Sequence, residues 1–143
     1  LRLIIRQVFV LHLPLDDDHE GVVGVLGGQL KQSGMSLGLF GFCLRDGRGE
    51  HSIVAGTSDW IESDTSMTGN RLHHQYQPES MRVVAGGRWV DPRTFEMTWQ
   101  FAETAFRDRV VCRFDGADSV TVDRSVNVNS AATSRPTLHG RTT

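Results

Sequence analysis

The sequence is short of several residue types, and each shortage excludes a class of protein. Its only cysteines, Cys43 and Cys112, lie far apart and form no CxxC motif, which excludes the dense disulfide framework of small secreted domains. We expect two buried thiols, with one long-range disulfide as the alternative. The net charge of −2 offers no electrostatic attraction to nucleic acid or to an anionic membrane, and no apolar run approaches the ~20 residues of a membrane-spanning helix. The composition therefore predicts a soluble domain with no nucleic-acid or membrane partner.

Motifs for binding phosphates and metal ions are also missing. Neither GxGxxG nor GxxxxGK occurs, so no glycine-rich loop is predicted to hold a phosphate. His19-Glu20 lacks the second histidine of HExxH. His73 and His74 are adjacent, so on a strand their side chains would point to opposite faces and could not hold one ion together. We therefore expect no cofactor and no metal ion.

The length and the apolar content fit a single folded domain. The chain has 143 residues, of which 38% are hydrophobic, and its 15 glycines bring the apolar fraction close to the globular average. Residues 1–36 are expected to form an N-terminal strand and then a glycine-rich linker or one short, weak helix, since each glycine costs about 1 kcal/mol inside a helix. Residues 37–130 are expected to form the β-domain, and residues 131–143 a tail. Residues 1–15 lack the pattern of a signal peptide, which favours a cytoplasmic location.

Polar and apolar residues alternate through the second half of the chain. The pattern is clearest in Phe95–Phe101, Arg107–Phe114 and Ser119–Asn129. Strands with one apolar and one polar face form antiparallel sheets, and short connections between successive strands make a meander. The sequence therefore predicts an all-β fold in which the meander closes into a barrel or a closed sandwich, because closure protects the edge strands.

Turns and strand registers can also be predicted. Asp46-Gly47-Arg48-Gly49 indicates a hairpin between Leu37–Arg45 and Glu50–Ala55, and Asp91-Pro92-Arg93-Thr94 has the signature of a type I turn. Apolar residues of neighbouring strands must oppose one another, because a slip of one residue would turn them to the wrong face. The pairs expected from this rule are Phe95 with Phe114, Met97 with Cys112, Trp99 with Val110, Glu96 with Arg113, Phe114 with Val120, and Cys112 with Val122.

One short segment matches a catalytic motif. Gly34-Met35-Ser36-Leu37-Gly38 has the GxSxG pattern of serine hydrolases. This motif places the serine correctly only where a strand precedes it and a helix follows it. The residues after Ser36 have the pattern of a strand, which favours a glycine-rich turn instead. The carboxylates and arginines between Glu96 and Arg113 are explained by ion pairs across strands. We therefore assign no catalytic residue.

The aromatic residues leave two interpretations open. A small barrel filled by its own side chains would use them as core, whereas a wider barrel would use them to line a pocket for a small apolar ligand. Sequence alone does not separate these interpretations. In the second, the residues expected at the ligand are Trp60, His73, Tyr76, Trp89 and Trp99.

Part of the chain resembles a known family. The segments that carry the resemblance are Gly86–Asp91, Thr94–Phe106, Phe114-Asp115-Gly116 and Val126–Asn129. Together they resemble the C-terminal all-β extension of serine hydrolases of the class C β-lactamase and penicillin-binding-protein type. The resemblance covers about two thirds of the chain, from His51 to Arg141. It implies a lipocalin-like accessory barrel that packs on a catalytic domain or mediates assembly.

The catalytic residues of that family are not found in this sequence. The family uses Ser-x-x-Lys and Tyr-x-Asn, but Gly28 stands three residues before Lys31, the only lysine, and Tyr76 is followed by Gln77-Pro78. We therefore expect a noncatalytic accessory domain, with a catalytic domain of the same or a longer chain, or a second copy, as its partner. A stand-alone barrel that binds a small apolar ligand is the alternative, and a serine hydrolase with a hidden site is a third hypothesis.

Overall fold

The computed structural model describes most of the chain. The described residues are 2–13, 21–32, 35–46, 49–67, 78–116, 119–128 and 132–141. Their side chains are described in residues 38–43, 49–67, 78–116, 119–128 and 132–140. His73 and Tyr76, two of the predicted ligand residues, lie outside the described residues, as do the central residues of the Asp46–Gly49 turn.

Every regular element in the described residues is a β-strand, as predicted, and no helix is found among them. The strands are β1 (Arg2–Leu13), β2 (Gly21–Gln32), β3 (Met35–Asp46), β4 (Gly49–Gly56), β5 (Ile61–Thr65), β6 (Met81–Asp91), β7 (Thr94–Phe101), β8 (Arg107–Asp115), β9 (Ser119–Val126) and β10 (Leu138–Arg141). They form one sheet in the order β1-β2-β3-β4-β6-β7-β8-β9-β10, with β5 paired beside β6. Described neighbours are antiparallel except at one parallel bridge, Gly56 with Gly86, which joins β4 to β6.

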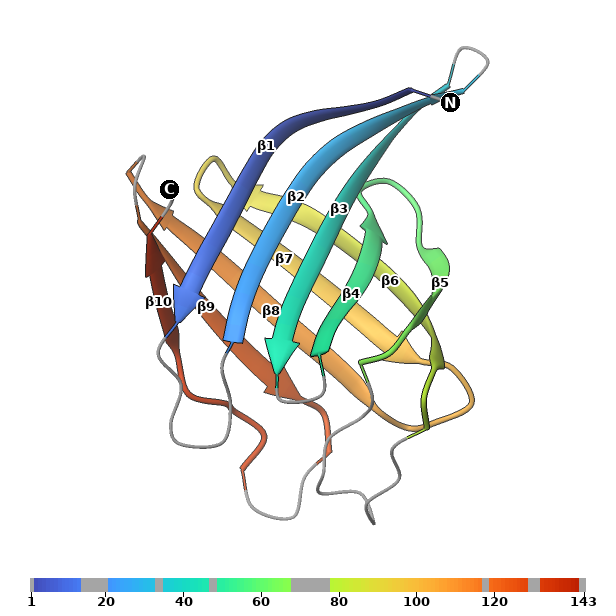
Figure 1. The fold of residues 1–143 in the computed structure, drawn as a ribbon, viewed down its shortest axis with the longest axis vertical. Helices are drawn as coiled ribbons and strands as arrows, with labels where there is room; N and C mark the ends of the chain where they lie inside the picture. The colour runs from blue at the N-terminus through green and yellow to red at the C-terminus, as the bar shows by residue number, and fades with distance from the viewer. Residues whose placement is uncertain are drawn as a thin grey trace.

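The sheet curls over on itself but does not close. Figure 1 shows β1–β4 lying across β6–β9, so that the two groups of strands face each other with the core between them. The predicted closure into a barrel or a closed sandwich is wrong, because no register joins β1 to β10 among the described residues. Strand β10 has only four residues and β1 has twelve, so β10 is too short to pair along β1 and close the barrel. The result is an open half-barrel.

The N-terminal part of the chain differs from the expected linker or short helix. Residues 21–32 form strand β2, which pairs with β1 on one side and with β3 on the other. Val22, Val23 and Val25 favour a strand because their branched side chains fit a pleated surface, while the neighbouring glycines oppose a helix. β2 is therefore part of the sheet. β10 is also part of the sheet, although it lies within residues 131–143, which were expected to form a tail.

The core follows the alternation seen in the sequence. In β7, the inward residues Phe95, Met97, Trp99 and Phe101 are all buried, and the residues between them are partly exposed. The opposing layer contributes Phe42 from β3 together with Ile53 and Ala55 from β4. Burying a side chain of this size contributes roughly 1.5–3 kcal/mol, so this face dominates the stability of the sheet. Cys112 is buried here as a thiol, and Cys43 is a partly buried one.

One predicted register is confirmed and the other is wrong by two residues. Between β8 and β9, Cys112 faces Val122 and Phe114 faces Val120, as expected. Between β7 and β8, Phe95 faces Cys112 instead of Phe114, and Trp99 faces Asp108 instead of Val110. The expected pairs of Met97 with Cys112 and Glu96 with Arg113 are wrong for the same reason. A shift of two residues keeps every side chain on its own face, so the hydrophobic pattern does not distinguish the two registers.

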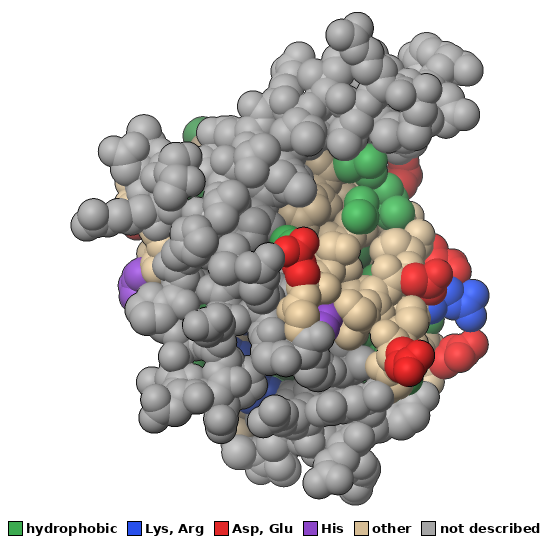
Figure 2. Space-filling model, viewed as in Figure 1, with side chains coloured by type: hydrophobic (Ala, Val, Ile, Leu, Met, Phe, Trp, Pro, Cys, Tyr) green, Lys and Arg blue, Asp and Glu red, His purple; other side chains and the backbone are tan. Residues whose placement is uncertain are grey.

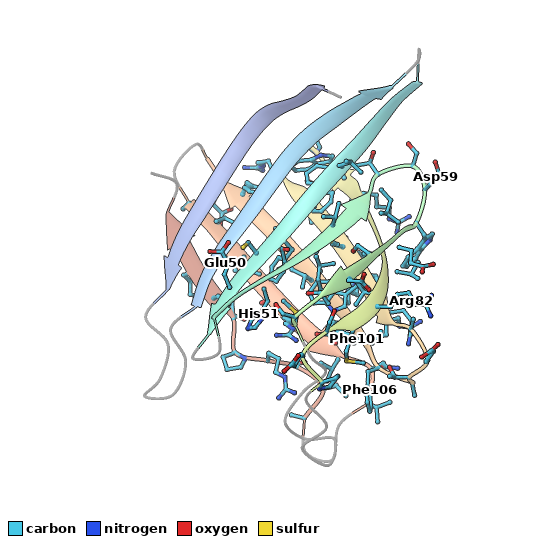
Figure 3. The ribbon with its side chains drawn as sticks, turned by 45° about the vertical axis from the view of Figure 1, so that its right-hand side comes forward. Glu50, His51, Asp59, Arg82, Phe101 and Phe106 are labelled. Carbon is cyan, nitrogen blue, oxygen red and sulfur yellow. The ribbon has the colours of Figure 1, made fainter. Side chains whose placement is uncertain are left out.

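The turn between β7 and β8 decides this register. Phe101 N–H donates to Phe106 O at 3.0 Å, which leaves only residues 102–105 in the turn. The Gln100 side-chain amide donates to Thr104 O and to Phe106 O, each at 2.9 Å. Ala102 N–H donates to Arg82 O at 2.8 Å, so this end of the hairpin is also tied to β6, near the labelled Arg82 in Figure 3. Polar contacts within the turn therefore select among registers that the core accepts equally.

The predicted turns are present. Asp46 pairs with Gly49, as the expected hairpin requires. At the other turn, Arg93 N–H donates to Asp91 Oδ1 at 2.7 Å, and the two strands on either side are β6 and β7. Ser36 lies on β3, so the strand expected after it is confirmed and the GxSxG segment is followed by no helix.

Candidate functional site

The three described tryptophans of the predicted ligand site lie in three different surroundings. Trp99 is in the core at 0% exposure, with its ring 5.3 Å from that of Phe42. Trp60 is 59% exposed and packs against Gly86, whose missing side chain would point away from the core. Trp89 is 46% exposed at one end of the half-barrel. They do not line one shared pocket.

Trp60 lies in a region where hydrophobic side chains reach the surface. On the right-hand side of Figure 2, where β4 and β5 lie, hydrophobic side chains gather at the surface beside several acidic ones. A Cβ at Gly86 would lie 3.2 Å from the Trp60 ring, so the indole rests directly on the backbone of β6. Trp60 therefore covers the outer face of the sheet at the bridge between β4 and β6.

Trp89 belongs to a group of four aromatic rings, which we call the aromatic cluster: Phe40, Trp89, Phe95 and Phe114. The Phe40 and Phe95 rings are stacked with their centroids 3.9 Å apart, and Trp89 meets Phe95 at 5.4 Å and Phe114 at 5.6 Å. Such pairs contribute about 0.5–1.5 kcal/mol beyond the area they bury. Phe95 and Phe114 are buried, whereas Trp89 and its neighbour Val90 are about half exposed, at 46% and 54%. The hydrophobic core thus continues to the surface at this point.

A glycine makes the close packing of the aromatic cluster feasible. A Cβ placed on Gly87 would lie 2.5 Å from the Phe95 ring, closer than two carbon atoms can approach. Gly87 pairs with Met97 in the register of β6 and β7, two positions from the pair Trp89 and Phe95 and on the same face of the sheet. The absence of a side chain at Gly87 therefore determines where the Phe95 ring lies, and with it the ring of Trp89.

A second feature is a charged pair inside the half-barrel. Asp108 is 3% exposed, and its Oδ2 accepts hydrogen bonds from Nε and Nη2 of Arg124, the first at 2.8 Å. The Arg124 guanidinium carbon lies 5.8 Å from the centre of the Trp99 ring, a cation–π distance. Trp99 Nε1 is buried and has no hydrogen-bond acceptor in the described structure. The sequence analysis placed Trp99 among the candidates but missed Asp108 and Arg124.

The strand registers explain why these three side chains meet. Trp99 on β7 faces Asp108 on β8, and residues directly opposite each other share one face of a sheet. Arg124 on β9 faces Val110, two positions from Asp108 on the same face, which is within reach of a long side chain. The signal was present in the sequence, because both charged residues occupy the even positions that the alternation assigns to the core.

A third feature is a histidine bonded to a serine. His51 on β4 is buried, and its Nδ1 lies 2.8 Å from Oγ of Ser66, which is exposed (His51 is labelled in Figure 3). The Ser66 hydroxyl can instead donate its proton to Glu50 O, which lies 3.4 Å from Ser66 Oγ. A hydroxyl has one proton: only if Ser66 gives it to Nδ1 does the histidine act as a base. The sequence showed no spacing that would bring a histidine to a serine, and the fold does so across fifteen positions.

The His51–Ser66 pair does not by itself make a hydrolytic site. Acyl transfer also needs hydrogen-bond donors aimed at the oxyanion. The N–H of Met67, the residue after Ser66, already donates to Thr65 Oγ1 at 3.0 Å. That N–H is therefore committed to a structural contact.

The described residues contain neither a cluster of metal ligands nor a membrane-spanning helix. No group of three or more His, Cys, Asp and Glu side chains there is arranged to hold a metal ion. The same residues contain no helix with the length and apolarity needed to cross a membrane.

Comparisons with known proteins return no relative of this chain. No protein-family model, no curated protein and no solved structure matches it.

Proposed function

We propose that this chain is a noncatalytic accessory β-domain that acts by docking on a partner protein through the aromatic cluster. The partner proposed is the catalytic domain of a serine hydrolase of the β-lactamase type, within the same or a longer chain, and the half-barrel is proposed to be lipocalin-like in outline. The observation that supports docking is the half-exposed Trp89 and Val90 above a buried aromatic pair. Clusters in which a large aromatic side chain continues from a packed core to the surface are typical of interface hot spots.

The packing of the interior favours docking over a hollow barrel. Trp99, Phe101 and Ile53 each have no exposed surface, so the described core is filled by its own side chains. A pocket for a drug-sized apolar ligand would instead leave the lining residues partly accessible. Trp89 is anchored by Phe95 and Phe114, and an anchored side chain loses little conformational entropy when a partner covers it.

The test is a matched pair of tryptophan substitutions. The purified chain is mixed with the catalytic domain of a class C β-lactamase-type hydrolase lacking its C-terminal β extension, and binding is measured by calorimetry. We expect Trp89→Ser to weaken binding at least tenfold, since a central tryptophan at an interface contributes about 2 kcal/mol or more. Trp60→Ser is the control, because Trp60 is even more exposed than Trp89, at 59% against 46%, but lies on the outer face of the sheet. Equal binding by both variants, or no binding by the unmodified chain, would reject the proposal.

The hydrogen bond between His51 and Ser66 favours one second candidate function, hydrolysis of esters at Ser66. A chromogenic ester assay separates the two functions. Turnover above the buffer rate that disappears in Ser66→Ala, and persists in Ser36→Ala, would establish the hydrolase. We expect no turnover, because the N–H next to Ser66 is already bonded to Thr65 and an oxyanion would lack that donor.

A further inference from the structure

The outer face of strands β1–β3 consists almost entirely of apolar positions. In β3, Phe42 is buried in the core and Phe40 packs against it, so the even positions of this strand belong to the inner face. Residues directly opposite each other share a face, so the registers extend this assignment from β3 to β2 and from β2 to β1. The positions on the other side, which we call the outer apolar face, are Leu3, Ile5, Val8, Val10 and His12 of β1, Val22, Gly24, Leu26, Gly28, Leu30 and Gln32 of β2, and Met35, Leu37, Leu39, Gly41, Cys43 and Arg45 of β3.

The remaining outer face of the sheet has the opposite character. The polar positions of the outer apolar face, His12, Gln32 and Arg45, all lie at or next to the end of a strand. On β7, in contrast, every outer position is polar: Thr94, Glu96, Thr98 and Gln100. Strands with one face in water alternate polar and apolar residues, whereas strands covered on both faces are apolar on both. The sequence of β1–β3 is therefore that of strands covered on both faces.

The pattern is clearest at the end of β1–β3 that extends beyond the curled body of the sheet, near the N-terminus in Figure 1. One row of inner-face positions there is Arg2, Lys31 and Ser36. The adjacent row of outer-face positions is Leu3, Leu30 and Leu37. Polar residues thus occupy the inner face and leucines the outer face, which is the reverse of a sheet whose outer face meets water. The apolar outer face is not a by-product of packing the core.

The border of the outer apolar face with β4 reaches the surface. Leu39 and Cys43 are both partly exposed, and so is Val54, the outer residue of β4 that pairs with Gly41. The next outer residue of β4, Ser52, is exposed and polar. Apolar patches larger than a few hundred Å² that are rimmed by polar residues mark interaction sites on soluble proteins.

We propose that the outer apolar face packs against the same face of a second copy of this chain. Each of the three strands has 12 residues. A strand of that length extends about 40 Å and three strands are about 14 Å wide, so the face covers roughly 550 Å² per copy. Two copies would bury about 1,100 Å² in total, which exceeds the ~1,000 Å² expected of a specific interface.

The shape and the charge of the face favour a copy of itself as the partner. The outer positions of β2 alternate large residues with glycines in the order Val22, Gly24, Leu26, Gly28, Leu30. Side chains of two packed sheets interdigitate, so the leucines of one copy match the glycine positions of the other. A two-fold interface must be self-complementary in this way. Arg45 faces Glu50 on β4, so the charged end of the face is balanced and two copies do not repel each other.

The experiment measures the molar mass of the chain in solution by light scattering over a range of concentrations. We expect a dimer for the unmodified chain. Leu26→Glu, which places a charge at the centre of the face, should raise the dissociation constant at least about tenfold because a two-fold interface receives each substitution twice. Thr98→Glu is the matched control, since Thr98 occupies a partly exposed outer position of β7, and it should leave the dimer unchanged.

Cys43 provides a second measurement that needs no substitution. Its thiol lies on the outer apolar face and is partly exposed, whereas Cys112 is buried in the core. A thiol reagent should label Cys43 quickly in dilute protein and severalfold more slowly at concentrations where the dimer forms, with Cys112 unlabelled in both. This readout remains valid if Leu26→Glu fails to fold.

Three results would overturn the proposal. They are a monomer at every concentration, a dimer that Leu26→Glu does not weaken, and a monomer that binds phosphatidylcholine vesicles, which would make lipid the occupant of this face. The outer apolar face and the aromatic cluster are separate surfaces. Trp89→Ser should therefore dimerise like the unmodified chain, even if docking through Trp89 is disproved.

Discussion

Removing the carboxylate of Asp108 tests the energetics of the charged pair directly. In Asp108→Ala, Arg124 stays inside the half-barrel with neither of its two hydrogen bonds to that oxygen. Breaking a fully buried ion pair by deleting one partner costs about 3–5 kcal/mol. Arg124 keeps 24% of its side chain exposed, so water recovers part of this loss and we expect about 2–3 kcal/mol. Urea denaturation followed by tryptophan fluorescence should show the midpoint falling by roughly 1–2 M.

Two companion variants make this result interpretable. Glu62→Ala removes a carboxylate whose pair with Arg82 is more than half exposed on both sides, and we expect the urea midpoint to stay unchanged because water screens this pair. The double variant Asp108→Leu with Arg124→Met replaces both charges by apolar groups, and its stability should return to within about 1 kcal/mol of the unmodified chain. If Asp108→Ala costs no more than Glu62→Ala, the pair does not contribute to stability and the reasoning fails.

Three further outcomes follow from single contacts. Burial, aided by the charge of Asp123, raises the pKa of the Cys112 thiol to about 12, so a thiol reagent at pH 8 should label Cys112 only as fast as the chain unfolds; rapid labelling would contradict its burial. Gly87→Ala should lower the free energy of unfolding by about 1–3 kcal/mol, because the new methyl group meets the Phe95 ring; unchanged thermal stability would show that the ring moves freely. The hydrogen bond from Arg109 lowers the pKa of Glu96 in the folded chain. The ionised Glu96 therefore stabilises the fold at pH values above its unfolded pKa, and this stabilisation is lost as the pH falls through the folded pKa. Glu96→Gln should destabilise the chain slightly at pH 7 and not at pH 2, which melting curves at both pH values would reveal.

The alternation of residues was sufficient to predict the faces of β7, β8 and β9 but not all of their registers. The alternation assigns Trp99 to the core, and Trp99 is fully buried there. The alternation does not show whether Trp99 pairs with Asp108 or with Val110, because both residues lie on the same face of β8. The difference is made by the side-chain amide of Gln100, which bonds carbonyls inside the turn. Local patterns of hydrophobicity contain no information about such contacts.

The candidate site shows a similar division. The sequence analysis named Trp89 as a candidate ligand residue because it is aromatic, and the structure packs its ring against that of Phe95. The sequence analysis counted Asp108 among the carboxylates explained by ion pairs across strands, although its even position already indicated the inner face. The bond between His51 and Ser66 joins a strand to a residue beyond the end of β5, and Arg135 reaches Arg124 from outside the regular strands. These contacts depend on the path that the chain takes after a turn, which a single sequence does not specify.

The single bridge between Gly56 and Gly86 has a consequence for the order in which the chain folds. On each side of it, every strand pairs with its neighbour in sequence, from β1 to β4 and from β6 to β10. Such contacts are local and close quickly, whereas joining the two halves requires closure of the long connection that ends at β6. We expect two meanders to form early and independently, and to associate late through the faces that carry Phe42 and Trp99. In pulse-labelled hydrogen exchange, amides in the β7–β8 hairpin would then gain protection before the N–H groups at Gly56 and Gly86.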